Sequence, residues 1–264
     1  MLELKNLRKT FNPGTINEKV ALRDLTLTLE KGEFLTVIGG NGAGKSTMLN
    51  SVAGVFLTDS GSITIDGRDV TRLPEHKRAP FIGRVFQDPM MGTAASMGIE
   101  ENLALAIRRG RPRGLKWGIT AKERLIYKDL LAHLGLGLED RLTAKVGLLS
   151  GGQRQALTLL MATIQEPKLL LLDEHTAALD PQTAAKVLEA TERVIRRDSL
   201  TTLMITHNMK DAIAHGTRLI MMYDGRIVID VKGEEKQKLT VEKLLEMFSK
   251  VSGSDEADDT LLLS

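Results

Sequence analysis

The sequence predicts an α/β protein with a parallel-sheet core, an antiparallel β subdomain and a helical insertion subdomain. Three observations predict this fold class. Near the start of the chain, apolar and polar residues alternate as they do in half-buried strands. Farther along, short apolar runs typical of buried parallel strands alternate with segments whose apolar residues have helical spacing. A chain of 264 residues suits one large domain or two small ones.

Two patterns give the expected strands. Strict alternation is typical of strands with one buried face, and unbroken apolar runs are typical of strands buried on both faces. The expected strands lie, in chain order, at 2–7, 25–29, 34–38, 63–65, 82–86, 169–172 and 203–205. Because the last two lie between helical segments, we expect them to be central parallel strands.

Helices are expected from apolar spacing and from caps. One helix follows the glycines that end the 34–38 strand and runs from 46 to about 53. Another has apolar residues at i, i+3, i+4 and i+7 over 157–164, which gives it one apolar face. A third begins after the N-cap Asp180, where Pro181 takes the first helical turn, and continues to about 197.

The expected domain organisation has one domain and a tail. Residues 1–248 form the domain, and its insertion, about 88–148, is expected to be mostly helical. Residues 249–264 are rich in acidic and small residues, so we expect them to form an acidic, mobile C-terminal tail.

Composition excludes several classes of protein. The formal net charge of +2 argues against a protein that coats nucleic acid. The absence of cysteine excludes a disulfide scaffold, a thiolate metal site and a cysteine nucleophile. No apolar run approaches the roughly 20 residues of a membrane-spanning helix, and the start lacks a secretory signal pattern. We therefore expect an intracellular chain whose membrane role, if any, depends on a partner.

A phosphate-binding loop is the first chemical motif. The run GGNGAGKST matches G-x-x-x-x-G-K-S/T between an expected strand and an expected helix, a context that an ordinary glycine-rich turn lacks. Glycines let backbone N–H groups point at phosphate oxygens, and the helix N-terminus adds positive charge. Lys45 is expected to reach the β and γ phosphates and Ser46 to bind Mg²⁺. The expected nucleotide-binding residues are Gly39, Asn41, Gly42, Ala43, Gly44, Lys45, Ser46 and Thr47.

A second motif is the acidic end of the strand at 169–172. Asp173 and Glu174 follow the apolar run at the carboxyl edge, where open parallel sheets bind ligands. Taken alone, this pair fits a solvated strand end equally well. Beside a phosphate loop, we expect Asp173 to hold Mg²⁺ and Glu174 to polarise the water that attacks the γ-phosphate.

The run LSGGQRQ at 149–155 resembles the signature of the ATP-binding-cassette (ABC) ATPases, and the resemblance covers about residues 1–248. Other family motifs follow in the family's order. Gln87 resembles the Q-loop glutamine, Asp180 the D-loop aspartate and His207 the switch histidine, while Phe11 lies where the family stacks an aromatic ring on adenine. The resemblance implies a P-loop NTPase fold of the RecA-like type that binds ATP and Mg²⁺.

Further implications of the resemblance concern assembly and catalysis. Two chains pair head to tail and sandwich two ATP, each between the phosphate loop of one chain and the signature of the other. The signature residues that contact nucleotide are Ser150, Gly151, Gly152 and Gln153. Gln87 contacts Mg²⁺ or water, and His207 contacts the γ-phosphate and the attacking water. Glu174, His207 and Gln87 are the expected catalytic residues, and Ser46, Gln87 and Asp173 the expected metal ligands.

The resemblance also implies partners. The chain is expected at the cytoplasmic face of the cell membrane, bound through a separate transmembrane permease subunit and paired with a second ATPase cassette, with a solute-binding protein as a further partner. Residues 83–89 and 100–106 resemble the importer branch associated with amino acids. The alternative is a soluble ABC ATPase of the iron–sulfur assembly type, whose signature departs from LSGGQRQ after the second glycine.

Two features depart from the family pattern or stay outside it. His175 stands where the family usually has proline after the catalytic glutamate, and we expect His175→Pro to keep substantial ATPase activity. A basic stretch at 108–116 precedes the single Trp117. It fits a solvated loop or contact with anionic lipid better than contact with nucleic acid, because the overall charge is near zero.

Overall fold

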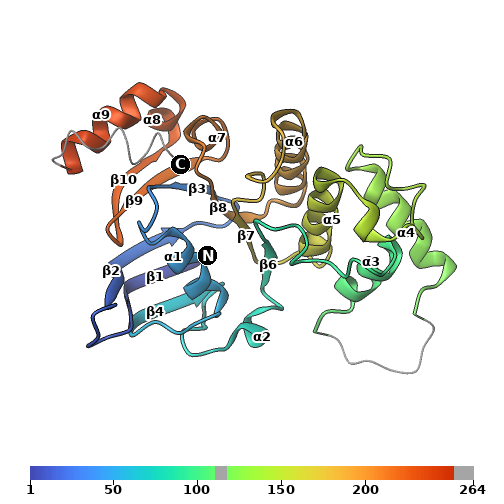
Figure 1. Cartoon of the computed structure of the whole chain (residues 1–264), viewed down its shortest axis with the longest axis horizontal. Coiled ribbons are helices and arrows are strands. Elements are labelled where there is room, and N and C mark those ends of the chain that lie inside the picture. Colours follow the sequence, from blue (N-terminus) through green and yellow to red (C-terminus); the bar gives the residue numbers. More distant parts are fainter. Residues whose placement is uncertain (111–117, 253–264) are drawn as a thin grey trace. The chain divides into compact units, whose positions relative to one another are not determined.

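The computed structural model describes residues 1–110 and 118–252. The chain divides into two compact units. Unit 1 contains residues 1–81 and the chain from residue 200 onward, and unit 2 contains residues 82–199. Figure 1 labels most of the helices and strands of both units.

Unit 1 begins with an antiparallel sheet. Its strands are β1 (Leu2–Phe11), β2 (Lys19–Leu29), β4 (Ser60–Ile65) and β5 (Arg68–Asp69), in the order β2-β1-β4-β5. The buried residues of β1 and β2 alternate with exposed ones, as one-sided burial requires. This sheet is the predicted antiparallel β subdomain.

A second set of strands in unit 1 carries the phosphate loop. Strand β3 (Phe34–Ile38) lies between β8 (Thr201–Ile205) and β9 (Arg218–Tyr223) and is parallel to both. Strand β10 (Arg226–Lys232) pairs antiparallel with β9. All five residues of β3 and all five of β8 are buried, as expected for strands that are covered on both faces.

Five helices complete unit 1 within the described residues: α1 (Lys45–Ala53), α2 (Glu75–Arg78), α7 (Met209–Ala214), α8 (Gly233–Gln237) and α9 (Val241–Ser252). Helix α9 packs Leu244 and Phe248 into a cluster with apolar residues of β9 and β10. Because α9 extends to Ser252, residues 249–252 are helical and do not belong to a mobile tail. Residues 253–264 lie outside the described part of the chain.

Unit 2 combines two parallel strands with helices. Strands β6 (Ile82–Val85) and β7 (Leu169–Asp173) are parallel neighbours. The α-helices are α3 (Ile99–Ile107), α4 (Ala121–Ala132), α5 (Gly151–Thr163) and α6 (Pro181–Asp198), and Val146–Leu148 form a 3-10 turn, η1. The segment 88–148 was expected to be mostly helical, but its described residues 88–98, before α3, and 133–145, after α4, are turns and bends. Glycines and small residues at 92–98 account for the first of these two stretches.

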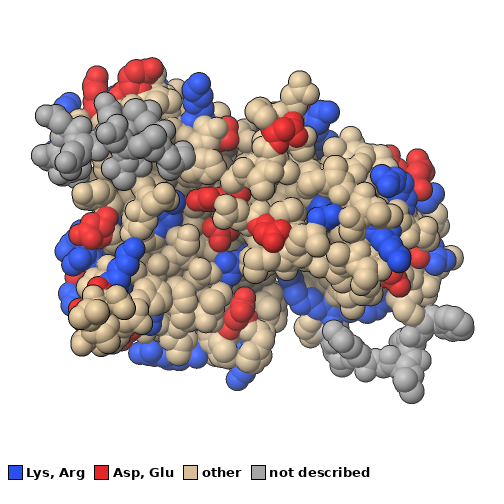
Figure 2. Space-filling model, in the orientation of Figure 1, with Lys and Arg blue, Asp and Glu red and all other residues tan. Residues whose placement is uncertain are grey.

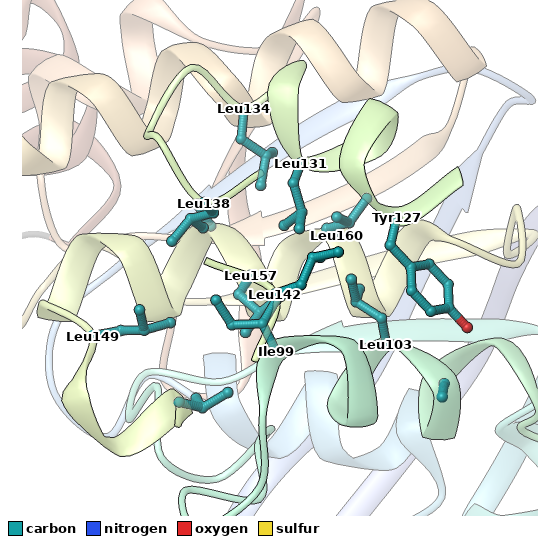
Figure 3. Close-up of a cluster of buried hydrophobic side chains, with 13 residues drawn as sticks. Ile99, Leu103, Tyr127, Leu131, Leu134, Leu138, Leu142, Leu149, Leu157 and Leu160 are labelled. Atoms are coloured by element: carbon teal, nitrogen blue, oxygen red, sulfur yellow. The ribbon is translucent and has the colours of Figure 1, made fainter. Parts of the chain in front are cut away.

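Helices α3, α4 and α5 share one apolar core. The largest members point toward one another in Figure 3, where Leu103 of α3, Leu131 of α4 and Leu157 of α5 converge. Tyr127 places its ring at the edge of this cluster and is fully buried. The spacing that predicted an apolar face on 157–164 therefore identified the side of α5 that builds this core.

The predicted fold class is confirmed, and the expected strands and three expected helices are present close to their expected bounds. Within 1–110 and 118–252, no helix combines the length and the apolar composition that crossing a membrane requires.

Candidate functional site

The phosphate loop leaves β3 at its carboxyl end and is shaped by three glycines. Gly39, Gly42 and Gly44 have φ values of 147°, 81° and 100°, a backbone region that side-chain-bearing residues rarely adopt. Space is also limiting at Gly44, where a β-carbon would lie 2.6 Å from the carbonyl oxygen of Ala21. The motif glycines are therefore required by the fold of the loop as well as by the approach of a phosphate.

The Lys45 side chain folds back onto the phosphate loop and bonds to its carbonyl oxygens. It is the first residue of α1 and is only 8% exposed. Its Nζ donates hydrogen bonds to the carbonyl oxygens of Gly39 at 2.5 Å and Gly40 at 3.2 Å. The ammonium thus points back over the loop, where a phosphate would accept the same donors.

The remaining loop residues surround the start of α1. Asn41, Gly42 and Ser46 are exposed, whereas Ala43 is buried and accepts a hydrogen bond from the Gly225 amide at 3.1 Å. Thr47, also predicted to bind nucleotide, is half-buried in α1. The loop is therefore anchored on one side and open at its tip and at the Ser46 hydroxyl.

His207 lies at the same sheet edge as the phosphate loop. It follows β8, and β8 and β3 run parallel with Val37 opposite Ile205. The Thr206 amide donates to the Val37 carbonyl at 3.1 Å, which extends this pairing to the residue before His207. The half-buried histidine and the loop thus follow the ends of neighbouring strands in unit 1.

Phe11, the expected adenine-stacking residue, already has an aromatic partner. Its ring packs edge to face with Phe56 at a centroid distance of 5.3 Å. Lys9 Nζ lies 5.6 Å from the Phe11 centroid and 5.8 Å from the Phe56 centroid. Phe11 remains half-buried, so part of its surface is open to a ligand. The aromatic pair was not expected from the sequence, because Phe56 carries no motif.

In unit 2, Gln87, Asp173 and Glu174 lie at the carboxyl ends of two neighbouring parallel strands. Strands β6 and β7 are parallel with Val85 opposite Leu172, so the exposed Gln87 and the half-buried Asp173 and Glu174 follow neighbouring strand ends. Glu174 adopts a left-handed backbone conformation with φ of 45°. This conformation is uncommon for residues with a side chain, although Asp24, Asp66, Glu166 and Asp224 of this chain adopt it as well.

No motif in the sequence indicates the cation that lies beside Asp173. Arg84, in the middle of β6, places Nη2 3.4 Å from Asp173 Oδ2, and the two side chains are 13% and 18% exposed. The guanidinium also lies 4.5 Å from the Phe86 ring centroid. A metal ion at Asp173 would have to share this carboxylate with Arg84 or displace it.

The signature residues begin helix α5. Ser150 is the N-cap, and Ser150 and Gln153 exchange hydrogen bonds of 3.3 Å between each side chain and the other's amide. Gly151 is exposed, whereas Gly152 is buried so closely against the Thr183 methyl group that a β-carbon there would overlap it. Gly152 is therefore also required for packing α5 against α6.

Asp180 is the N-cap of α6, as the Asp-Pro pair predicted. Its Oδ1 accepts a hydrogen bond from the Thr183 amide at 3.1 Å. The hydroxyl and amide of Thr183 lower the pKa of the Asp180 carboxyl below its ordinary value of 3.8. The aspartate is exposed, so it can contact a second molecule while it caps the helix.

His175 is buried, at 2% exposure, immediately after Glu174. Its Nε2 lies 3.2 Å from Thr191 Oγ1, and the Thr191 hydroxyl donates to the Val187 carbonyl at 2.8 Å. Because the hydroxyl hydrogen is used, Nε2 is the donor to Thr191. A proline at this position would lack that donor. The imidazole thus ties the segment after Glu174 to the middle of α6.

The residues expected to bind metal fit Mg²⁺ in chemistry. Mg²⁺ prefers hard oxygen ligands and usually combines one or two carboxylates with phosphate oxygens and water. The Ser46 hydroxyl and the Asp173 carboxylate are such ligands, and Gln87 offers an amide oxygen. Among the described residues, no group of three or more His, Cys, Asp or Glu side chains could hold a metal ion.

Only the start of the basic stretch is described. Arg108 pairs with Glu123 at 2.6 Å, and burial lowers the pKa of the half-buried Arg109 guanidinium. Arg108 is therefore paired with an acidic residue of the chain, and the Arg109 guanidinium is partly shielded from solvent. Residues 111–117, including Trp117, lie outside the described residues.

Comparison with known proteins gives consistent matches. A family model described as ABC transporter matches residues 22–177. The chain is 47% identical to a tyrosine transport ATP-binding protein of Clostridioides difficile, over 94% of this chain and 98% of that one. It is 32% identical to the ABC transporter ATP-binding protein YxdL of Bacillus subtilis, over 96% and 95%. Among solved structures, a dimeric ATP-binding cassette bound to ADP and Pi matches with a TM-score of 0.74 and 30% identity, over 88% and 98%.

Proposed function

This chain belongs to the ABC transporter family of ATPases, and from that premise we propose that its ATP hydrolysis powers the import of an amino acid, with tyrosine as the first substrate to test. The observation that supports tyrosine as the substrate is the 47% identity to a tyrosine transport ATP-binding protein over nearly the full length of both chains. A methionine import ATP-binding protein of Rhizobium johnstonii, 38% identical over 86% of this chain and 60% of that one, supports the broader class.

Nucleotide binding is assigned to the loop and to Phe11. The amides of Gly39–Thr47 and the Lys45 ammonium bind the phosphates, and Lys45 exchanges its carbonyl partners for phosphate oxygens as ATP enters. Phe11 stacks on adenine. Ser46 and Asp173, with Gln87, would hold Mg²⁺, which when bound neutralises phosphate charge and orients the phosphate oxygens.

Hydrolysis is assigned to Glu174 with His207 and Gln87. Glu174 accepts a proton from the attacking water as the water oxygen bonds to the γ-phosphorus and the bond to the bridging oxygen of ADP breaks. His207 holds the γ-phosphate and the water in line. Gln87 positions the water. The strained backbone of Glu174 and its neighbour His175, tied to α6, support a fixed carboxylate position.

Two copies of the chain complete the nucleotide sites. We assign a head-to-tail pair in which Ser150, Gly151, Gly152 and Gln153 of one copy approach the phosphates bound by the other, with Asp180 alongside. The amides of the first turn of α5 form a second phosphate-binding helix end, and the solved relative is dimeric. ATP then favours the closed pair, and hydrolysis releases it.

The membrane partner is a separate permease subunit. It holds this chain at the cytoplasmic face of the cell membrane, and an extracytoplasmic solute-binding protein delivers the amino acid. Nucleic acid is not a partner in this proposal. On the face drawn in Figure 2, basic and acidic side chains are interspersed and form no extended basic surface.

The nucleotide chemistry is tested on the purified chain. Lys45→Ala is expected to lose ATP binding and hydrolysis together. Glu174→Gln is expected to bind ATP, hydrolyse it at a rate reduced by at least about 100-fold and accumulate as a dimer on a sizing column. Glu189→Gln, an exposed substitution on α6, is the matched control and should behave like the parent. Hydrolysis by Glu174→Gln at the parent rate would overturn the base assignment.

The transport role is tested in the native cell. Uptake of labelled tyrosine, phenylalanine and methionine is compared in cells that carry the parent chain or Lys45→Ala. Loss of tyrosine uptake alone supports the proposal, and unchanged uptake of all three amino acids rejects the substrate class. A polytopic membrane protein that co-purifies with the chain supports the permease. Recovery with cytosolic partners only would favour the iron–sulfur assembly alternative.

A further inference from the structure

Lys19 is a basic residue that no motif includes, and it stands opposite Phe11. It begins β2, and the antiparallel register of the first hairpin pairs its Cα with that of Phe11, the last residue of β1. Directly opposed residues of antiparallel strands project from the same face, with Cβ atoms about 4.5–5.5 Å apart. The lysine stem therefore leaves the hairpin on the face that presents the Phe11 ring.

The Lys19 ammonium reaches the phosphate loop. A β-carbon built on Gly42 would lie 3.1 Å from Lys19 Nζ. Gly42 is exposed and stands at the open tip of the loop, between Asn41 and Ala43. The hairpin thus brings a second cation to the loop, besides Lys45 at the start of α1.

This ammonium has no partner within 1–110 and 118–252. Lys19 makes no hydrogen bond or ion pair to any described residue, and it is exposed. The neighbouring carboxylate, Glu18, is instead bonded to the Gly14 amide at 2.6 Å. Lys9 on the same hairpin differs, because it pairs with Asp59 at 3.1 Å. A long side chain that ends beside a phosphate loop without an acidic partner leaves its charge for a ligand.

We propose that Lys19 is a second phosphate-binding cation of this nucleotide site and contacts the phosphate chain of ATP or ADP. The inference rests on the proposed function only in assuming that the loop binds nucleotide phosphates. An ammonium carries three donors on a flexible stem, which suits phosphate oxygens that differ in position between ATP and ADP. If adenine lies against Phe11 and the phosphates lie in the loop, the nucleotide extends along Lys19, which is paired with Phe11.

The first test measures the dissociation constants of ATP, ADP and adenosine for the full chain by calorimetry at low salt. Lys19→Met removes the charge and keeps most of the stem. We expect it to weaken ATP and ADP about tenfold, the size of one partly exposed charge-assisted hydrogen bond, and to leave adenosine unchanged. The matched control is Lys31→Met, an exposed lysine beyond the far end of β2, which should stay within about twofold of the parent.

Two further measurements separate a contact from a local structural effect. Lys19→Arg keeps the charge and should recover most of the ATP affinity. Raising the salt concentration should weaken ATP binding more for the parent than for Lys19→Met, because an exposed ion pair is screened. Equal effects of Lys19→Met and Lys31→Met on ATP would overturn the inference, and so would equal weakening of adenosine and ATP.

Failure of this inference is distinguishable from failure of the proposed nucleotide site. If Lys45→Ala binds ATP like the parent, the phosphate loop is not the binding site and both proposals fall. If Lys45→Ala loses ATP while Lys19→Met retains parent affinity, only the role of Lys19 is rejected.

Discussion

Replacing Arg78 with methionine tests how helix α1 is held behind the phosphate loop. Arg78 is 0% exposed, at the end of α2. Its guanidinium donates hydrogen bonds to four backbone carbonyls, those of Ser51 at 2.7 Å, Val52 at 2.9 Å, Leu73 at 2.8 Å and Thr71 at 3.1 Å. The side chain therefore satisfies acceptors in two different segments, the last turn of α1 and the turn at 71–73.

The position of this cation explains its value to the fold. Ser51 and Val52 belong to the last turn of α1, where a helix carries partial negative charge. Burial lowers the pKa of the Arg78 guanidinium, and the Asp69 carboxylate opposes that shift. Arginine remains protonated in proteins, so the charge persists at working pH. Arg78 thus fixes the C-terminal end of the helix whose N-terminal end carries Lys45.

The expected loss in the free energy of unfolding follows from the hydrogen bonds. A bond to a charged group contributes about 1.5–3 kcal/mol, and bonds from one guanidinium are not additive. Methionine fills part of the volume but leaves buried carbonyls without donors, so we expect Arg78→Met to cost about 3 kcal/mol. For a chain of this size, that lowers Tm by about 6–12 °C.

The assay is thermal unfolding followed by circular dichroism, with and without ATP. The control is Arg72→Met, because Arg72 is exposed and makes a single 3.3 Å hydrogen bond to the Thr58 carbonyl; it should cost at most about 0.5 kcal/mol. Arg78→Lys keeps the charge but loses the planar set of guanidinium donors. Its Tm should fall between those of Arg78→Met and Arg72→Met. If Arg78→Met melts within about 2 °C of the parent, about the effect of a surface change, the reasoning is refuted.

The remaining predictions concern the adenine ring, a helix cap and a buried imidazole. Phe11→Ala should weaken ATP more than inorganic triphosphate in a binding titration, and equal weakening would exclude stacking. Because Thr183 lowers the pKa of Asp180 in the folded state, the cap's contribution is complete above the unfolded pKa and is lost as pH falls through the folded value. Asp180→Asn should therefore flatten the fall in Tm between about pH 5 and 3, and an unchanged acid limb would contradict this. Thr191→Val leaves the His175 donor without its acceptor and should cost about 1–3 kcal/mol in urea unfolding, whereas Thr191→Ser should cost far less; equal losses would assign the effect to packing.

Local patterns predicted most of the framework and the centre of the nucleotide site. The loop at 39–47 could be recognised because its function depends on backbone conformation, and glycine is the residue that permits that conformation. The signature could be recognised because it is a continuous run that resembles the family's, and its Ser150 and Gln153, three residues apart, cap one helix. In both cases the interacting groups lie within a few residues of one another.

Features that depend on residues far apart in the sequence could not be predicted. Arg84 lies beside Asp173 because β6 and β7 pair in one register, and nothing around either residue indicates this. The buried bond from His175 to Thr191 likewise depends on how α6 packs. The sequence identified His175 as a departure from the family pattern but could not show that it anchors the segment after Glu174.

Strand register also decides whether Lys19 belongs to the nucleotide site. Side chains of a strand alternate between faces, so a shift of one residue between β1 and β2 would turn Lys19 away from the face that carries Phe11. Register shifts do occur in this hairpin, between Leu7 and Lys9 and between Lys9 and Thr10. Counting from the far end of the hairpin, where Leu2 pairs with Leu29, would therefore misplace the lysine by one residue. The position of Lys19 beside the phosphate loop depends on how β2 pairs with β1. The loop motif could therefore be recognised from the sequence, but Lys19 only from the structure.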